Sequence, residues 1–77
     1  MVIMNSINLY NKSNKPLRFI IEPIAAEYSV SPGSQAKIVG DLDGTEVVYW
    51  GEEFIAIWVL SVVRVLDEME EVIKPNI

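Results

Sequence analysis

Polar and apolar residues alternate along several short segments of the chain. Tyr28 and Val30, for example, alternate with Glu27, Ser29 and Ser31. A period of two is typical of a β-strand with one buried face and one face in contact with water. The pattern is visible in three segments: residues 3–10, 27–31 and 35–39.

Turn-forming residues separate these segments at short intervals, and the segments are rich in Ile, Val, Tyr, Phe and Trp. Short β-prone segments with this spacing are typical of sandwiches and barrels. The sequence therefore predicts an all-β fold, a small antiparallel β-sandwich or barrel of about seven or eight strands, with residues 1–77 forming one domain. The expected strands are Val2–Tyr10, Leu17–Glu22, Glu27–Ser31, Gln35–Val39, Glu46–Trp50, Phe54–Leu60, Val62–Leu66 and Val72–Lys74.

Three connections have a recognisable turn chemistry. Pro23 should end a strand, because proline has no N–H for the ladder. Pro32-Gly33 fits the central positions of a type II turn, in which glycine takes a positive φ. Asp43-Gly44 lies between two apolar segments and predicts a β-hairpin with a type I′ turn.

The last third of the chain is compatible with two structures. The β-branched residues between Ile55 and Val65 favour strands up to Leu66. The segment Asp67–Lys74 (DEMEEVIK) favours a turn or a short helical piece, because it has good helix formers and acids in its first turn. The alternative is one amphipathic helix from Glu52 to Lys74, since apolar residues also recur there at helical spacing.

The chain has 77 residues and contains neither cysteine nor histidine. These absences exclude disulfides, cysteine nucleophiles, histidine-based triads and ordinary zinc or copper sites. No glycine-rich phosphate loop is present. We therefore expect no cofactor, no metal site and no catalytic residues, that is, a protein that is not an enzyme.

The net charge of −5 is unevenly distributed. Residues 1–37 carry four basic and two acidic side chains, whereas residues 38–77 carry two basic and nine acidic ones. Such an acidic chain repels phosphate backbones, so nucleic acid is not an expected partner. A protein with a basic surface is an expected partner, although acidic residues also serve simply to keep a protein soluble.

The N-terminal residues do not have the pattern of a signal peptide. The longest apolar segment, Phe54–Val63, has ten residues, about half of what a membrane-spanning helix needs. We therefore expect a cytoplasmic protein that does not interact with membranes.

Glu22 and Glu27 flank a proline-containing turn. If residues 23–26 form a four-residue hairpin loop, the two carboxylates lie opposite each other, as paired acids do in glycoside hydrolases. The alternative, which we favour, is that both are solvated ends of a structural turn, because close carboxylates alone are weak support for catalysis.

The seven aromatic residues are mostly expected in the core. Trp50, at a strand end beside Gly51, is the best candidate for a partly exposed contact. Four glutamates complete the set of candidate interaction residues, which are Glu22, Glu27, Trp50, Glu52 and Glu53.

The segment LRFIIEPIAAEYSVSPGSQAKIV, residues 17–39, resembles a signature of small uncharacterised bacterial proteins. In that signature a strand ends in Glu-Pro and is followed by Glu-Tyr and a proline-glycine turn. Ile24 stands where the family usually has Trp, and Ser31 replaces the first proline of the turn. Residues 54–59 (FIAIWV) and 63–67 (VRVLD) resemble its later strands. The resemblance implies an all-β fold and no particular activity.

Three functions are compatible with the sequence. The first is a non-enzymatic, acidic β-domain that binds a basic protein, in the manner of an immunity, inhibitor or accessory protein. The second is a carboxylate-based hydrolase that uses Glu22 and Glu27. The third is a ligand-binding or structural module that self-associates into a homo-oligomer through exposed strand edges.

Overall fold

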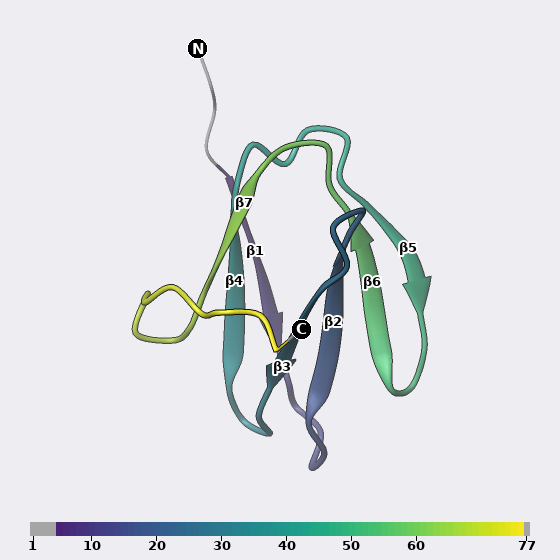
Figure 1. Ribbon diagram of the computed structural model, residues 1–77. Helices are drawn as coiled ribbons and strands as arrows, with labels where there is room; N and C mark the ends of the chain where they lie inside the picture. Colours follow the sequence, from purple (N-terminus) through teal and green to yellow (C-terminus); the bar gives the residue numbers. More distant parts are fainter. Residues whose placement is uncertain (1–4, 77) are drawn as a thin grey trace.

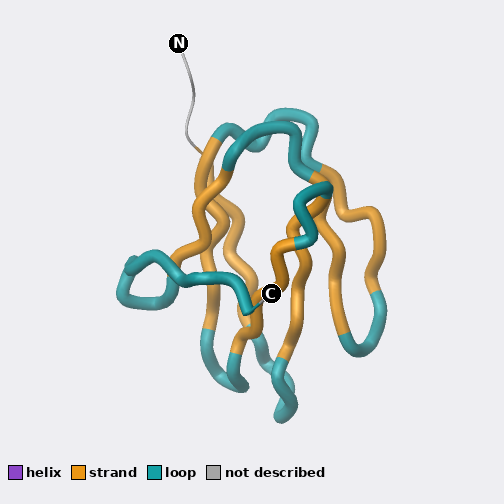
Figure 2. The backbone as a smooth tube through the Cα atoms, in the orientation of Figure 1, coloured by secondary structure: helices purple, strands orange, loops and turns teal. Residues whose placement is uncertain are grey.

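The computed structural model describes residues 5–76, which form seven strands in two sheets and contain no helix (Figures 1 and 2). The three-stranded sheet has the order β1-β4-β7 and the four-stranded sheet the order β3-β2-β6-β5. The strands are β1 (Asn5–Tyr10), β2 (Leu17–Glu22), β3 (Ala26–Val30), β4 (Gln35–Gly40), β5 (Glu46–Trp50), β6 (Phe54–Trp58) and β7 (Val63–Leu66). The predicted small all-β sandwich is confirmed.

One strand pair departs from the antiparallel arrangement that the sequence predicts. Strands β2 and β6 run parallel, with Phe19 paired to Ile55 and Ile21 to Ile57, and the other four pairs are antiparallel. The parallel pair arises because β6 inserts between β2 and β5, which are far apart in the sequence. The four-stranded sheet is therefore mixed.

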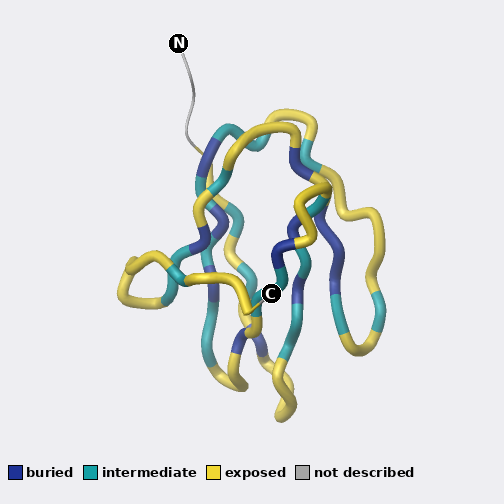
Figure 3. Tube along the Cα trace, in the orientation of Figure 1, coloured by how far each residue is buried: buried dark blue, intermediate teal, exposed yellow. Residues whose placement is uncertain are grey.

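The core lies between the inward faces of the two sheets. Its largest fully buried side chains are Phe19, Ile21, Ile38, Ile57 and Val65, from four different strands. Buried residues alternate with less buried ones along β2 and β4, whereas β6 has three buried residues in a row, and Figure 3 shows buried positions in both sheets. The alternation predicted for residues 27–31 and 35–39 is confirmed, since Val30, Ala36 and Ile38 are buried.

Asn11 is the only buried polar residue among those described. Its amide nitrogen donates to the carbonyls of Lys15 and Val30, and its side-chain oxygen accepts from the N–H and hydroxyl of Ser13. Because a buried polar group must be hydrogen-bonded, this side chain fixes the turn between β1 and β2.

Two of the predicted turns are present. Strand β2 ends at Glu22, immediately before Pro23, whose peptide bond is cis. Between Ser31 and Ser34 the chain forms a tight turn in which the Ser34 N–H donates to the Ser31 carbonyl, and Gly33 has φ 79°. This positive φ at the third position is that of a type II turn.

The hairpin predicted at Asp43-Gly44 is absent. A turn does form, with the Thr45 N–H bonded to the Leu42 carbonyl, but of its two central residues only Gly44 has a positive φ. A type I′ turn requires positive φ at both. Strands β4 and β5 belong to different sheets, so the turn is part of a crossover. Asp-Gly specifies a local reversal, and it does not specify which strands then pair.

The C-terminal segment also differs from expectation. Residues 67–76, the C-terminal strap, contain neither the predicted strand Val72–Lys74 nor a helix, and the alternative helix Glu52–Lys74 is wrong because β6 and β7 occupy that range. Asp67 forms a turn by accepting the N–H groups of Met69 and Glu71. Only Val72 makes a bridge, to Leu66 in β7.

Among the described residues, other boundaries differ by one or two residues from the prediction. The first strand is described from Asn5, so the predicted positions Val2–Met4 lie outside the described residues. Strand β6 stops at Trp58 rather than Leu60, and β7 starts at Val63. Within residues 5–76 there is no helix long and apolar enough to cross a membrane.

Candidate interaction surface

The two glutamates that flank the β2–β3 turn are not opposite each other in the structure. In the β2–β3 ladder Glu27 pairs with Ile20, and Ile21 pairs with Ala26. Glu22, the last residue of β2, therefore lies just beyond the residues of β2 that pair with β3. The carboxylate pair that a 23–26 loop would create, the alternative that we did not favour, is not formed, because the reversal begins one residue earlier.

Glu27 forms an ion pair with Arg18 instead. Arg18 Nη1 lies 3.3 Å from Glu27 Oε1, and Arg18 Nη2 lies 4.0 Å from Glu53 Oε2. The same guanidinium lies 5.9 Å from the centre of the Phe54 ring. Arg18 thus brings together two of the predicted residues, Glu27 and Glu53, and neutralises part of their charge.

These side chains belong to the outward face of the four-stranded sheet. Because Ile21 and Ile57 point into the core, their neighbours along each strand point outward. We call this surface the acidic sheet face. Its members are Arg18, Ile20, Glu22, Glu27, Ser29, Glu46, Tyr49, Phe54, Ala56 and Trp58.

Two stacked aromatic rings lie at the hairpin end of the acidic sheet face. Tyr49 of β5 stacks on Phe54 of β6, with ring centroids 4.7 Å apart. Gly51 helps to hold this arrangement, because a Cβ at that position would lie 2.7 Å from the Tyr49 ring. The stacked pair adjoins Arg18, so aromatic, basic and acidic groups meet at this end of the sheet.

The expectation that most aromatic residues are in the core is wrong. Only Phe19 is fully buried, and it stacks on the partly buried Tyr28 with centroids 5.1 Å apart. Tyr10, Tyr49, Trp50 and Trp58 are all exposed. Burial raises the pKa of Tyr28 above its usual value.

Trp50 is 74% exposed, as its position beside Gly51 predicts. It pairs with Ile55 and therefore points to the opposite side of β5 from Tyr49. Glu52 and Glu53 form the exposed tip of the β5–β6 hairpin, next to Trp50. Figure 3 shows that exposed residues run along β5 and into this region.

Sequence reasoning missed the most informative aromatic residue of the acidic sheet face. Trp58 is 40% exposed and has a glutamate on each neighbouring strand, Glu22 on β2 and Glu46 on β5. The segment FIAIWV is apolar at every position, so no change of polarity reveals which residues face outward. The period of two does contain the signal, because Phe54, Ala56 and Trp58 alternate with three core residues.

An apolar cleft lies beside Trp58 at one end of the sandwich. We call it the end cleft; its volume is about 370 Å³. It is formed by the β2–β3 turn and the β6–β7 connection, which Figure 1 shows at the upper end of the molecule. Ile24, Leu60 and Val62 are among its most exposed side chains, at 74%, 69% and 92%.

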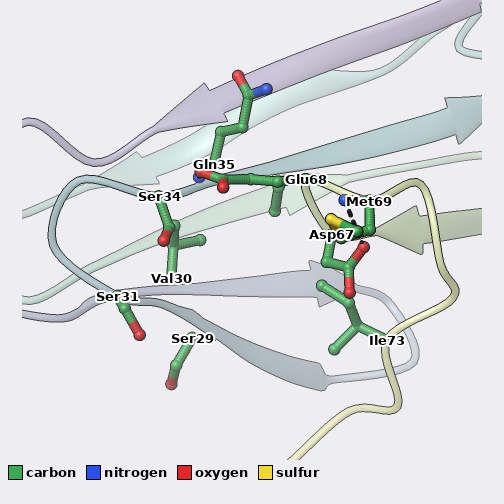
Figure 4. Close-up of a pocket in the computed structure, with 10 residues that line it drawn as sticks. Ser29, Val30, Ser31, Ser34, Gln35, Asp67, Glu68, Met69 and Ile73 are labelled. Atoms are coloured by element: carbon green, nitrogen blue, oxygen red, sulfur yellow. Dashed lines mark hydrogen bonds between the residues drawn. The ribbon is translucent and has the colours of Figure 1, made fainter.

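A second cavity, of about 280 Å³, lies between the β3–β4 turn and the C-terminal strap (Figure 4). Ser29 and Ser31 are on one wall, and Asp67, Glu68 and Met69 are on the other. Its carboxylates already have structural partners: Asp67 accepts from two backbone N–H groups and Glu68 from the N–H of Gln35. This cavity is a consequence of how the strap docks.

In the part of the chain from Asn5 to Asn76, no three acidic side chains are grouped closely enough to hold a metal ion. The pKa of Glu70, on the strap, is lowered by its hydrogen bond to Lys37 and by the charge of that lysine. This pair, at 2.9 Å, lies on the three-stranded sheet and not on the acidic sheet face.

Comparison of the chain with models of protein families, with curated proteins and with solved structures gave no match. The resemblance of residues 17–39 to a bacterial signature therefore stays a prediction.

Proposed function

We propose that this protein is a binding module that recognises a basic surface of another protein through its acidic sheet face. The observation that carries the proposal is the exposed Trp58 between Glu22 and Glu46, on the same face as the Tyr49–Phe54 stack.

The chemistry of the face supports this function. Protein interfaces are enriched in aromatic residues, which supply large contact areas at low entropic cost. Three of its charged members are glutamates and one, Arg18, is basic, and the exposed Glu52 and Glu53 extend the acidic character to the hairpin tip. Such a field attracts a basic partner and accelerates its association.

Capture from a lysate of the source cells tests the proposal. The immobilised protein should retain a basic protein at low salt and release it as the salt concentration rises, because exposed charges are screened. Glu52→Lys should reduce the retained amount at least several-fold. Glu71→Lys is the matched control, since Glu71 is an exposed glutamate on the strap. Equal loss with both variants would contradict a role for this face.

Self-association is a second candidate, favoured by the free edge of β5. The strap covers the edges of β3 and β7, where Asn76 N–H donates to the Glu27 carbonyl and Ile73 N–H to the Val65 carbonyl. Strand β5 has no such cover among the described residues, and its last four residues, 47–50, are apolar and more than half exposed. An uncovered apolar edge is a template for adding another strand.

Sedimentation across a dilution series tests the second candidate. Dimers that form through β5 should dissociate on dilution, and Val48→Lys should raise the dissociation constant about tenfold or more, which is ~1.4 kcal/mol. Met69→Lys places the same charge on the exposed strap and should have no effect. A monomer at every concentration would exclude this candidate.

A further inference from the structure

We propose that the end cleft and Trp58 form one subsite for a short basic and apolar segment of the partner. An apolar side chain of that segment occupies the cleft, and the neighbouring arginine or lysine lies over Trp58 between Glu22 and Glu46. This inference rests on the proposed function and specifies which part of the acidic sheet face recognises which chemistry.

The cleft itself requires an apolar occupant. Its lining is apolar except for Ser61, and it contains no charged residue. Its volume of about 370 Å³ is ample for one leucine, isoleucine or phenylalanine side chain. Core residues such as Ile21 form its floor, but Ile24, Leu60 and Val62 at its border are at least 69% exposed, and clustered apolar exposure of this kind marks a binding site.

The charges beside the cleft require a cationic neighbour. Glu22 and Trp58 are register partners across the β2–β6 pair, and Glu46 and Trp58 are partners across the β5–β6 pair. Since adjacent strands lie ~5 Å apart, the two glutamate backbones are about 10 Å apart with the indole between them. A cation over the indole is stabilised by cation–π attraction to the ring and by the negative charge of both carboxylates.

No described basic side chain already fills that position. The ion pairs of Arg18 are with Glu27 and Glu53. Arg18 is also four residues before Glu22 on β2, a separation of about 13 Å along a strand. The carboxylates of Glu22 and Glu46 make no ion pair within residues 5–76, so the charge at this end of the face is uncompensated.

The same charges argue against a second copy of the chain as the occupant. Each copy has a net charge of −5, and Arg18, the basic residue of this face, is already paired with Glu27. A partner segment with adjacent apolar and basic side chains satisfies both halves of the subsite. Arginine is favoured over lysine because its planar guanidinium stacks on indole and can contact two carboxylates.

An NMR titration of the full chain with acetyl-leucyl-arginine amide tests this assignment. The indole N–H of Trp58 and the amides of Leu60 and Val62 should shift, whereas the indole N–H of Trp50 should not. Weak, millimolar binding is sufficient for this readout. Glu22→Gln and Glu46→Gln should each weaken binding about threefold or more, and Glu71→Gln should leave it unchanged.

Two further probes separate the parts of the subsite. Acetyl-leucyl-citrulline amide has almost the shape of the first probe without its charge, and acetyl-glycyl-arginine amide lacks the apolar side chain. Both should bind several-fold more weakly. Equal binding of the citrulline probe would overturn the role of the two glutamates. Shifts confined to Tyr49 and the hairpin tip would overturn the subsite but leave the proposed function standing. Absence of any shift would also overturn the subsite. It would not bear on the proposed function, which capture from a lysate tests separately.

Discussion

At the scale of single residues, the turn between β1 and β2 depends on one buried amide. Asn11 is 3% exposed and serves four hydrogen bonds, two as donor and two as acceptor. The sequence indicates a turn in residues 11–16, but nothing in the letters shows which of its two asparagines is buried. That distinction comes from the Val30 carbonyl, which approaches from β3.

Asn11→Ala should destabilise the protein by about 1–3 kcal/mol, because it leaves the buried Val30 carbonyl without its donor. Asn14→Ala is the matched control, since Asn14 is an exposed residue of the same turn. Urea unfolding of both variants measures the difference. Equal midpoints for the two would show that the Asn11 network does not stabilise the fold.

A pH titration tests the Lys37–Glu70 pair. The pair lowers the pKa of Glu70 in the folded protein, so its contribution to stability is present above the unfolded pKa, near 4.5, and is lost as the pH falls through the lower folded value. Lys37→Met should return the pKa of Glu70 to its usual range. Side-chain carbon NMR of Glu70 measures this, and an unchanged pKa in the variant would show that Lys37 is not the cause.

At the scale of elements, period-two patterning predicts strands and faces well but leaves their pairing open. Tyr28 and Val30 face the core as expected, and β2, β4 and β5 lie within one residue of their predicted bounds. The crossover at Asp43-Gly44 and the parallel β2–β6 pair depend on contacts between distant segments. The local sequence does not encode such contacts. The strap likewise takes up its structure by docking on β7.

The strap should stabilise the sandwich through one anchor residue. Ile73 packs against the core and donates its N–H to Val65 in β7. Ile73→Ala should therefore reduce the free energy of unfolding by about 1–2 kcal/mol, less than a fully buried isoleucine would.

Val72→Ala is the control for this prediction, because Val72 is exposed beside Ile73. It should change the free energy of unfolding only slightly. Urea denaturation distinguishes the two, and a smaller effect for Ile73 than for Val72 would contradict the anchoring role.

In the molecule as a whole, the inward faces of the two sheets and the outward face of the four-stranded sheet differ in character. The inward faces supply the core, and the acidic sheet face carries exposed aromatic rings, three glutamates and one arginine. Of the five residues predicted from sequence, Glu22 and Glu27 are on this face, and Glu52 and Glu53 are at its hairpin tip. Trp50 points away from it. Trp58 and Glu46 were missed because their significance comes from being neighbours across strands.

Site-specific photo-crosslinking can show whether the acidic sheet face is the surface that binds a partner. Tyr49, on the acidic sheet face, and Tyr10, on the three-stranded sheet, are both 52% exposed and are therefore matched positions for a photoreactive phenylalanine derivative. The proposed function predicts that the probe at position 49 gives an adduct with a basic protein, suppressed by high salt, and that the probe at position 10 gives none. An adduct from position 10 alone, or adducts of equal yield from both, would contradict it.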